Sequence, residues 1–217
     1  MYLSKVITIT TMSKLFSINK SSIDKISLKS ETNGTYQKVY INYKDQGMLF
    51  RLKDLKSPFG IQQFKDTENH SLSVSINEEL ESFLNSLKKK ICEEVVDKEL
   101  VKGVDSLEKA DVLMNDFYTT NEKYPSLMKL KVHYTKTGIR TPESFCCKMT
   151  LNDENICKDV KECKIRSKMC SMDILIKPSF YKIGTKFGVS FGIYQIKFKS
   201  EKQRVNLLEI ESEDESD

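Results

Sequence analysis

Alternation of apolar and polar residues is the clearest pattern in the chain, and it predicts strands. Between residues 36 and 53 two such runs, YQKVYINY and GMLFRLK, are separated by KDQG, which is typical of a hairpin with Asp45 and Gly47 in the turn. The segment HSLSVSI, residues 70–76, alternates in the same way and predicts a half-buried strand. Residues 1–35 give only weak strand signals, so the well-defined pattern begins with the first hairpin.

The C-terminal half of the chain carries further strand patterns. In LMKLKVHY the apolar side chains share one face, whereas Lys129, Lys131 and His133 share the other, which predicts a strand with a basic outer surface. SFCCKMTL follows the turn TKTG and is expected to be the partner of that strand. FYKIGTKFGVSFGIYQIKFK predicts a terminal hairpin with IGT as its turn, and a slip in the apolar phase predicts a β-bulge near Gly192.

One strong helix interrupts the strands. Asn77 is a favourable N-cap, acidic residues follow it where the helix dipole favours them, and apolar residues recur at helical spacing as far as Val95. Gly103 offers a stop, and a weaker helix is expected over residues 106–117. The opposite face of the strong helix carries lysines at 88–90, most often a solvated surface and less often a contact to nucleic acid.

About eight strands joined mostly by short links, with one strong helix, predict a mainly β fold. Short links favour antiparallel pairing, and the arrangement is typical of an OB-fold-like Greek-key barrel with a helical elaboration. Residues 1–206 are expected to form one OB-like domain, within which 1–35 are weakly defined, and residues 207–217 a disordered acidic tail.

Composition supports one folded core, since 39% of the 217 residues are hydrophobic and 30% are charged. No run of about 18 apolar residues occurs, and the start lacks the pattern of a secretory signal, so neither a membrane span nor export is expected. A cytoplasmic location is therefore the expectation, with the nucleus as the alternative.

Charge is distributed unevenly along the chain. The formal net charge is +4, but residues 207–217 contain six acids and no base. Since those six belong to the 31 acids of the chain, the rest holds 35 bases against 25 acids, a net charge of +10. A basic body with an acidic tail suits a protein that binds a polyanion, although a tail of this kind can also serve solubility alone.

Motifs for catalysis and for metal binding are missing from the sequence. There is no GxxxxGK[ST], GxGxxG, GxSxG or HExxH, and the six cysteines form no CxxC pair. A thiol-dependent hydrolase would need a cysteine nucleophile and a histidine base, for which Cys146 or Cys147 with His133 are the candidates. No motif around these residues supports that role. The sequence therefore predicts no enzyme, no metal and no cofactor.

Aromatic residues interleaved with basic ones point to single-stranded nucleic acid, because bases stack on rings while lysine and arginine follow the phosphates. About half of the rings on alternating strands are expected in the core. The candidate DNA-binding residues are Tyr40, Tyr43, Arg51, Lys53, Lys129, Lys131, His133, Arg140, Tyr181, Lys182, Lys186 and Tyr194.

The C-terminal segment MDILIKPSFYKIGTKFGVSFGIYQIKFK with its acidic tail resembles the final strands of the single-stranded DNA-binding proteins of large nucleocytoplasmic DNA viruses. It is also similar in layout to the T7-type phage proteins, and SPFGIQQF followed by HSLSVSI resembles the viral group. Linear plasmids of yeast cytoplasm carry related machinery. The resemblance implies an OB-fold core that binds single-stranded DNA with little sequence preference during replication, recombination or repair of a viral or plasmid replicon.

The same resemblance implies that the tail contacts replication partners such as a polymerase or a helicase. The residues of this partner-binding tail are Leu207, Leu208, Glu209, Ile210, Glu211, Glu213, Asp214, Glu215 and Asp217. Two alternatives stay open, an RNA-binding or late-transcription factor and a structural protein that packages DNA, and both are separable by comparing affinities for single-stranded DNA, RNA and duplex.

Overall fold

The computed structural model describes residues 14–17, 23–34, 36–65, 70–132, 148–151, 154–155 and 160–199. The strands are β1 (Lys14–Ser17), β2 (Ile26–Asn33), β3 (Tyr36–Tyr43), β4 (Gln46–Leu55), β5 (Ile61–Gln63), β6 (His70–Ser75), β7 (Tyr118–Thr119), β8 (Leu127–Val132), β9 (Lys148–Leu151), β10 (Glu154–Asn155), β11 (Met172–Ile183) and β12 (Lys186–Phe198). The helices are α1 (Glu78–Asp97), α2 (Leu107–Leu113) and α3 (Val160–Met169), with a short 3-10 turn at Ile23–Lys25.

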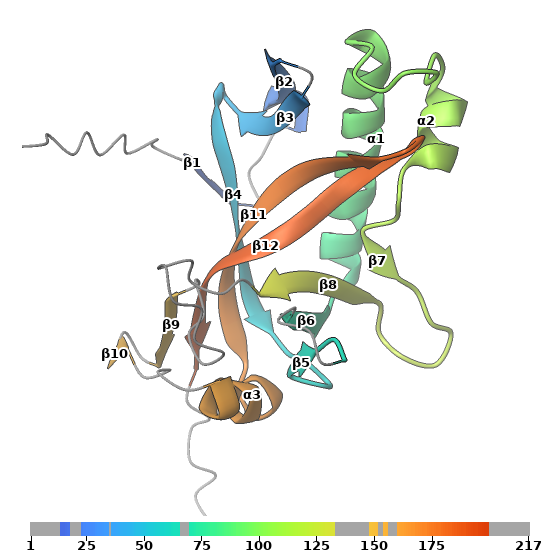
Figure 1. Ribbon diagram of the computed structural model, residues 1–217. Helices are drawn as coiled ribbons and strands as arrows, with labels where there is room; N and C mark the ends of the chain where they lie inside the picture. The colour runs from blue at the N-terminus through green and yellow to red at the C-terminus, as the bar shows by residue number, and fades with distance from the viewer. Residues whose placement is uncertain are drawn as a thin grey trace, which may run out of the picture.

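The strands form one strongly curved sheet in the order β2-β3-β4-β11-β12-β8-β6-β5. The long hairpin of β11 and β12 runs through its middle, α1 lies behind that hairpin, and α3 lies near β5 (Figure 1). The expectation of a mainly β fold with one strong helix is confirmed. Among the described strands the sheet is open, because its path ends at β2 and β5 rather than closing into a complete barrel.

Two tight turns fix the register of the two main hairpins. Lys44 and Asp45 have φ of 50° and 62°, the left-handed values that a two-residue turn of the right twist requires, and Tyr43 pairs with Gln46. Asp45 therefore lies in the turn as predicted, whereas Gly47, which was also expected there, already belongs to β4. In the terminal hairpin Ile183 pairs with Lys186, so the expected turn at IGT is confirmed.

The predicted bulge lies two residues beyond Gly192. Leu175 pairs with Gln195 and Ile176 with Ile193, which leaves Tyr194 as the extra residue of β12. This extra residue accounts for the slip in apolar phase that the sequence shows.

The expected partner of the strand at 127–132 is wrong. β8 pairs antiparallel with β6 and parallel with β12, whereas β9, the described part of SFCCKMTL, pairs with β10 and β12. The apolar face of β8 determines this choice, because Met128 and Leu130 are buried opposite Val74 and Leu72 of β6. Burial against a distant strand outweighs proximity in sequence.

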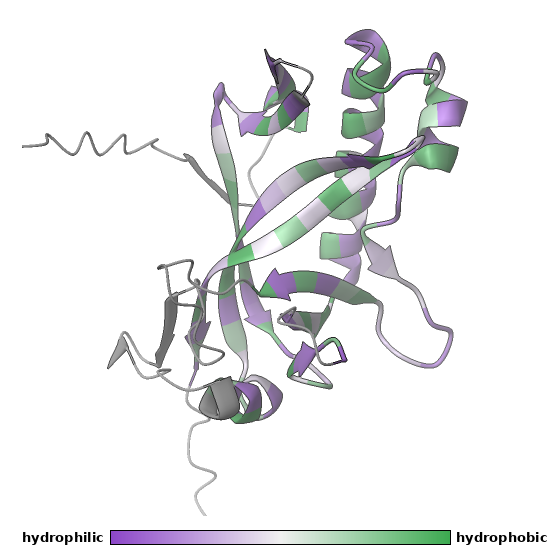
Figure 2. Ribbon diagram, in the orientation of Figure 1, coloured by the Kyte–Doolittle hydropathy of each residue, from purple (hydrophilic) through white to green (hydrophobic). Residues whose placement is uncertain are grey.

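One hydrophobic core lies between the sheet and α1. Phe50 contacts Phe83 of α1 edge to face at 5.5 Å between ring centroids, and Phe191 contacts Phe117 in the same way at 5.3 Å. Figure 2 shows hydrophobic and hydrophilic residues alternating along the strands and a hydrophobic stripe on α1. The predicted N-cap of α1 is confirmed, since Asn77 Oδ1 accepts a hydrogen bond from Leu80 N–H at 3.0 Å.

Of the helices in the described part of the chain, none has both the length and the apolarity that spanning a bilayer demands.

Candidate nucleic-acid interface

The face of the sheet that points away from α1 is defined by strand register, and we call it the outer face. Residues directly opposite each other in a ladder share a face. Lys177 of β11 pairs with Gly192 of β12, Gly192 lies beside Lys131 of β8, and Lys131 pairs with Ser71 of β6. This row crosses four strands, and the buried residues of the same strands point to the opposite side.

The outer face is basic. Along β6, β8, β11 and β12 it presents lysines and one acid, Asp173, and Arg51 of β4 adds a further positive charge opposite Leu175. The lysines are Lys129, Lys131, Lys177, Lys186 and Lys197. Such an excess of positive charge on a broad strand surface attracts the phosphates of a nucleic acid.

The charge of Asp173 is neutralised within the protein. Its carboxylate lies 2.8 Å from Lys199 Nζ and 3.3 Å from Arg51 Nη2, and it accepts a hydrogen bond from Asp54 N–H at 3.0 Å. Burial opposes ionisation of Asp173, but the partners outweigh it, so the pKa of this carboxyl is lowered from its ordinary value. The acid stays charged and paired, and the field of the outer face remains positive.

The middle of the outer face is a floor of small side chains. Gly188, Ser190 and Gly192 succeed one another on β12, and Ser190 pairs with Ser179 of β11. The ring of Tyr181 lies directly over Gly188, where an added Cβ would come within 2.8 Å of the Tyr181 hydroxyl oxygen. A larger residue at this position would displace the ring.

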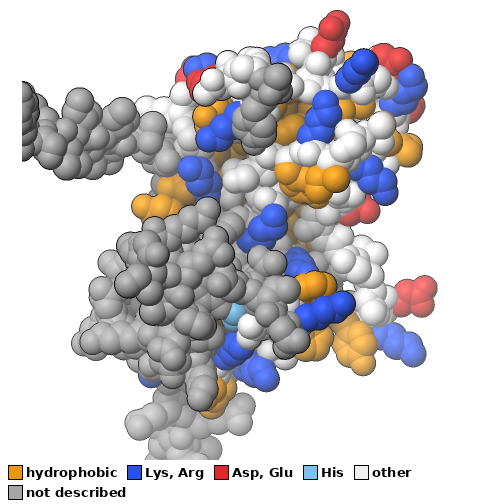
Figure 3. All heavy atoms as spheres, in the orientation of Figure 1, with side chains coloured by type: hydrophobic (Ala, Val, Ile, Leu, Met, Phe, Trp, Pro, Cys, Tyr) orange, Lys and Arg blue, Asp and Glu red, His pale blue; other side chains and the backbone are white. Residues whose placement is uncertain are grey.

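Tyr181 is held in place at the edge of that floor. Its hydroxyl oxygen accepts a hydrogen bond from Asn115 Nδ2 at 2.7 Å, and Lys131 Nζ lies 5.9 Å from its ring centroid. A phosphate bound by Lys131 would therefore bring its base to the ring of Tyr181. Figure 3 shows Lys and Arg side chains through the middle of this view where grey atoms do not cover it, with acidic side chains near the rim.

The structure brings six of the predicted residues to the outer face, namely Arg51, Lys129, Lys131, Tyr181, Lys186 and Tyr194. Lys129 and Lys131 are exposed and Met128, Leu130 and Val132 are buried, so the predicted basic outer surface of this strand is confirmed. Tyr194, the extra residue of the bulge, is 58% exposed.

Other predicted residues lie elsewhere. Tyr43 is 8% exposed and belongs to the core, so it is not available to stack a base. Lys182 has the opposite phase to Tyr181 and lines a pocket with the loop after α1. Tyr40 is half-buried on β3, where Lys38 Nζ lies 4.6 Å from its ring centroid, and Lys53 is exposed on β4 two residues beyond Arg51.

His133, Arg140 and the tail residues at 207–217 lie outside the described residues. The structure also places residues on the outer face that the sequence reasoning missed, above all Lys177 and the small residues of β12. Strand alternation in MDILIKPSFYKI could have found Lys177, because it shares the phase of Tyr181.

The lysines of α1 at 88–90 belong to a different surface. Lys88 Nζ lies 2.9 Å from Asp111 and 3.0 Å from Asp116, and Lys90 Nζ lies 3.0 Å from Glu94. Two of the three lysines thus have carboxylate partners within the protein, which leaves little positive charge there for a nucleic acid.

A pocket of about 540 Å³ between α1 and α2 is lined by Cys92, Lys88 and Asp111 among other residues. Its buried Cys92 is 4% exposed, and burial raises the pKa of this thiol to about 11, opposite to what a nucleophilic cysteine needs. Within the described ranges no cluster of three or more possible metal ligands occurs.

No protein-family model matches the chain, and no curated protein matches it in sequence. Among solved structures it is similar to the single-stranded DNA-binding protein from bacteriophage Enc34, with a TM-score of 0.44 and 10% identity over 86% of this chain and 98% of that one. The same phage protein in complex with single-stranded DNA has a TM-score of 0.43 at 10% identity, over 83% of this chain and 98% of that one.

The single-stranded DNA-binding protein encoded by bacteriophage T7 is similar with a TM-score of 0.42 and 9% identity, over 78% of this chain and 97% of that one. At these scores no residue of this chain is matched to a residue of those proteins. Binding of single-stranded DNA is stated for those phage proteins and is not transferred to this chain by the comparison.

Proposed function

We propose that this chain is a sequence-tolerant single-stranded DNA-binding protein without catalytic activity. The observation that carries the proposal is the outer face, where Lys129, Lys131 and Lys177 surround a floor of glycine and serine beside the fixed ring of Tyr181. Lysines of this kind follow a phosphate backbone and do not read base edges, so binding depends little on sequence.

The geometry favours a single strand over a duplex. A ring on a sheet surface contacts a base by stacking on its flat face, and that face is already occupied by neighbouring base pairs in a duplex. Gly188 lies beneath the ring of Tyr181, and the small residues Ser190 and Gly192 leave space beside that ring for a base to approach.

The process in which the protein acts is proposed from the sequence resemblance. Coating of exposed strands would serve replication, recombination or repair of a viral or plasmid replicon in the cytoplasm, and the acidic tail at 207–217 would contact a polymerase or a helicase. The charge difference between body and tail supports this division of roles, since a tail with six acids and no base is repelled by DNA.

A fluorescence titration with oligo(dT) at two salt concentrations tests the proposal. The logarithm of affinity should fall linearly with the logarithm of salt concentration, by about 0.7 for each phosphate that is neutralised. Duplex of equal length should bind much more weakly. A salt-insensitive interaction, or equal affinity for duplex, would contradict the proposal, and the second result would favour DNA packaging.

A double variant locates the contact. Lys129→Glu with Lys131→Glu should weaken binding and leave the thermal unfolding temperature almost unchanged, because both side chains are exposed. The matched control is Lys89→Glu with Lys102→Glu, which changes the net charge equally at exposed positions on α1 and the loop after it. Equal losses in both variants would mean that total charge, and not the outer face, determines affinity. Higher affinity for matched RNA would favour the RNA-binding alternative.

A further inference from the structure

Phe64 is an exposed ring at the β5 end of the outer face. Gln62 of β5 pairs with Ser71 of β6, and Ser71 pairs with Lys131, so β5 continues the row of outer residues. Phe64 follows Gln62 by two residues and is 58% exposed, whereas Ile61 is 3% exposed and belongs to the core. The ring of Phe64 is therefore not part of the hydrophobic core, unlike the side chain of Ile61.

The strand directly before this ring, β5, is firmly held. Ile61 N–H donates a hydrogen bond to Ser167 Oγ of α3 at 2.9 Å, and Gly60 N–H donates to Ser57 Oγ at 2.9 Å. Gly60 has φ of 65° and lies so close to α3 that an added Cβ would be 2.5 Å from Lys168 Cγ. The position of β5 is thus set before any ligand binds, which lowers the entropic cost of binding.

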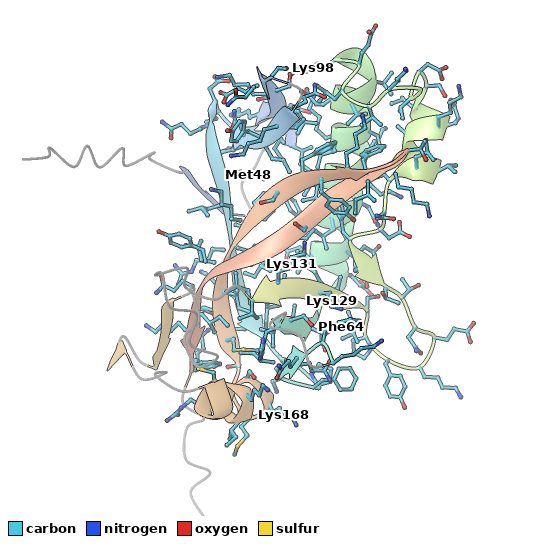
Figure 4. All side chains as sticks on the ribbon, in the orientation of Figure 1. Met48, Phe64, Lys98, Lys129, Lys131 and Lys168 are labelled. Carbon is cyan, nitrogen blue, oxygen red and sulfur yellow. The ribbon has the colours of Figure 1, made fainter. Side chains whose placement is uncertain are left out.

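Both ends of the outer face combine a ring with a lysine. Lys65 Nζ lies 5.5 Å from the ring centroid of Phe64, as Lys131 Nζ lies 5.9 Å from that of Tyr181. In Figure 4 Lys131, Lys129 and Phe64 follow one another from the middle of the view towards its lower right. Each combination offers a flat surface for a base and a cation for the adjoining phosphate.

We infer, on the basis of the proposed function, that Phe64 with Lys65 is a second base-stacking site and that the DNA strand crosses the sheet from β11 to β5. Four strand spacings of about 4.8 Å give about 19 Å across the sheet, and the register offsets Phe64 from Tyr181 by six residues along the strands, or about 20 Å at about 3.3 Å per residue. The two rings are therefore about 28 Å apart, which at about 3.4 Å for each stacked nucleotide corresponds to about eight nucleotides. A strand of about four nucleotides is then too short to reach Tyr181 and Phe64 together.

Oligo(dT) titrations at two lengths, about four and about twelve nucleotides, test the inference with the full chain. Phe64→Leu keeps an apolar side chain but removes the ring, and it should weaken binding of the longer strand by roughly 5- to 150-fold, the equivalent of one lost base stack. The shorter strand should bind almost as it does to the wild type. Phe64→Tyr should retain wild-type affinity for both lengths, because stacking needs only the ring.

Tyr124→Leu is the matched control, since Tyr124 is 70% exposed but lies beside the acids Glu78, Glu79 and Glu81. Tyr124→Leu should leave the affinities for the shorter and the longer oligo(dT) unchanged. The inference is overturned if Phe64→Leu binds the longer strand like the wild type, or if it weakens both lengths equally. If the lysine variant at 129 and 131 weakens binding and Phe64→Leu does not, this inference alone fails. If neither changes affinity, the proposed outer-face site fails as well.

Discussion

At the scale of single residues, the conformation of Tyr181 depends on a glycine from the neighbouring strand. Gly188 pairs with Tyr181 and leaves room for its ring, and Asn115 donates a hydrogen bond to its hydroxyl oxygen. Glycine in a strand costs stability on its own account, so its presence here is explained by the ring that covers it. The glycine and the hydrogen bond together fix the orientation of the ring.

Tyr181→Ala should weaken binding to oligo(dT) by about 1 to 3 kcal/mol, the usual contribution of one stacked base. Tyr181→Phe keeps the ring and loses only the hydrogen bond from Asn115, so its affinity should stay close to that of the wild type. Fluorescence titrations of both variants, corrected for the folded fraction from thermal unfolding, check this prediction. If the alanine variant loses thermal stability but binds normally, the ring pins the hairpin and does not stack a base.

At the scale of elements, α1 protects the edge of the sheet at β2. The carboxylate of Glu94 accepts a hydrogen bond from Leu28 N–H at 3.0 Å, and Lys98 Nζ donates to Leu28 O at 2.7 Å. Glu94 and Lys98 also form an ion pair at 2.7 Å. The helix thereby satisfies both backbone groups of one edge residue, which would otherwise be a template for pairing with another chain.

Glu94→Gln should lower the free energy of unfolding at neutral pH by about 1 to 3 kcal/mol, since it removes the charge that strengthens these hydrogen bonds and forms the ion pairs with Lys90 and Lys98. Burial opposes ionisation of Glu94, but hydrogen bonds from Lys98, Leu28 N–H and Lys90 outweigh it and lower its pKa from the ordinary value of 4.5. The stabilisation is therefore present above that value and lost as pH falls through the lower pKa of the folded state. Urea unfolding against pH measures it.

Glu93→Gln, one residue earlier on α1, serves as the control for this pH series. The difference in stability between the wild type and Glu94→Gln should shrink as the solution becomes acidic. A difference that is constant with pH would show that the carboxylate charge at this position does not contribute.

Local patterns allowed α1 and the two hairpins to be predicted, whereas the neighbours of β8 could not be. The N-cap at Asn77 and the apolar stripe of α1 act within a few residues, and the turn at 183–185 depends on Gly184, which has φ of 62°. The pairing of β8 with β6 joins segments separated by α1 and α2, and it depends on which apolar faces meet in the core. No single segment contains that information.

At the scale of the whole molecule, the candidate site likewise combines features that local patterns predict with features that they do not. Alternation alone placed Lys129 and Lys131 outside, and the same rule would have excluded Tyr43 and Lys182, whose phases are those of buried neighbours. The approach of Lys131 to Tyr181 could not be predicted, because β12 lies between their strands and its small side chains permit the contact.

The distribution of charge over the whole chain leads to the last prediction, which concerns the tail. Deleting residues 207–217 removes six acids and raises the net charge from +4 to +10. A tethered anionic segment competes with DNA phosphates at high effective concentration, so deletion should tighten oligo(dT) binding at low salt. The gain should shrink as salt rises past about 0.15 M, where the Debye length is about 8 Å.

Replacing the six acids by Gln and Asn should reproduce the tighter binding while keeping Leu207, Leu208 and Ile210. Titration of the three proteins at several salt concentrations is the measurement, and weaker binding of both variants at every concentration would mean that the acids support the DNA-binding form.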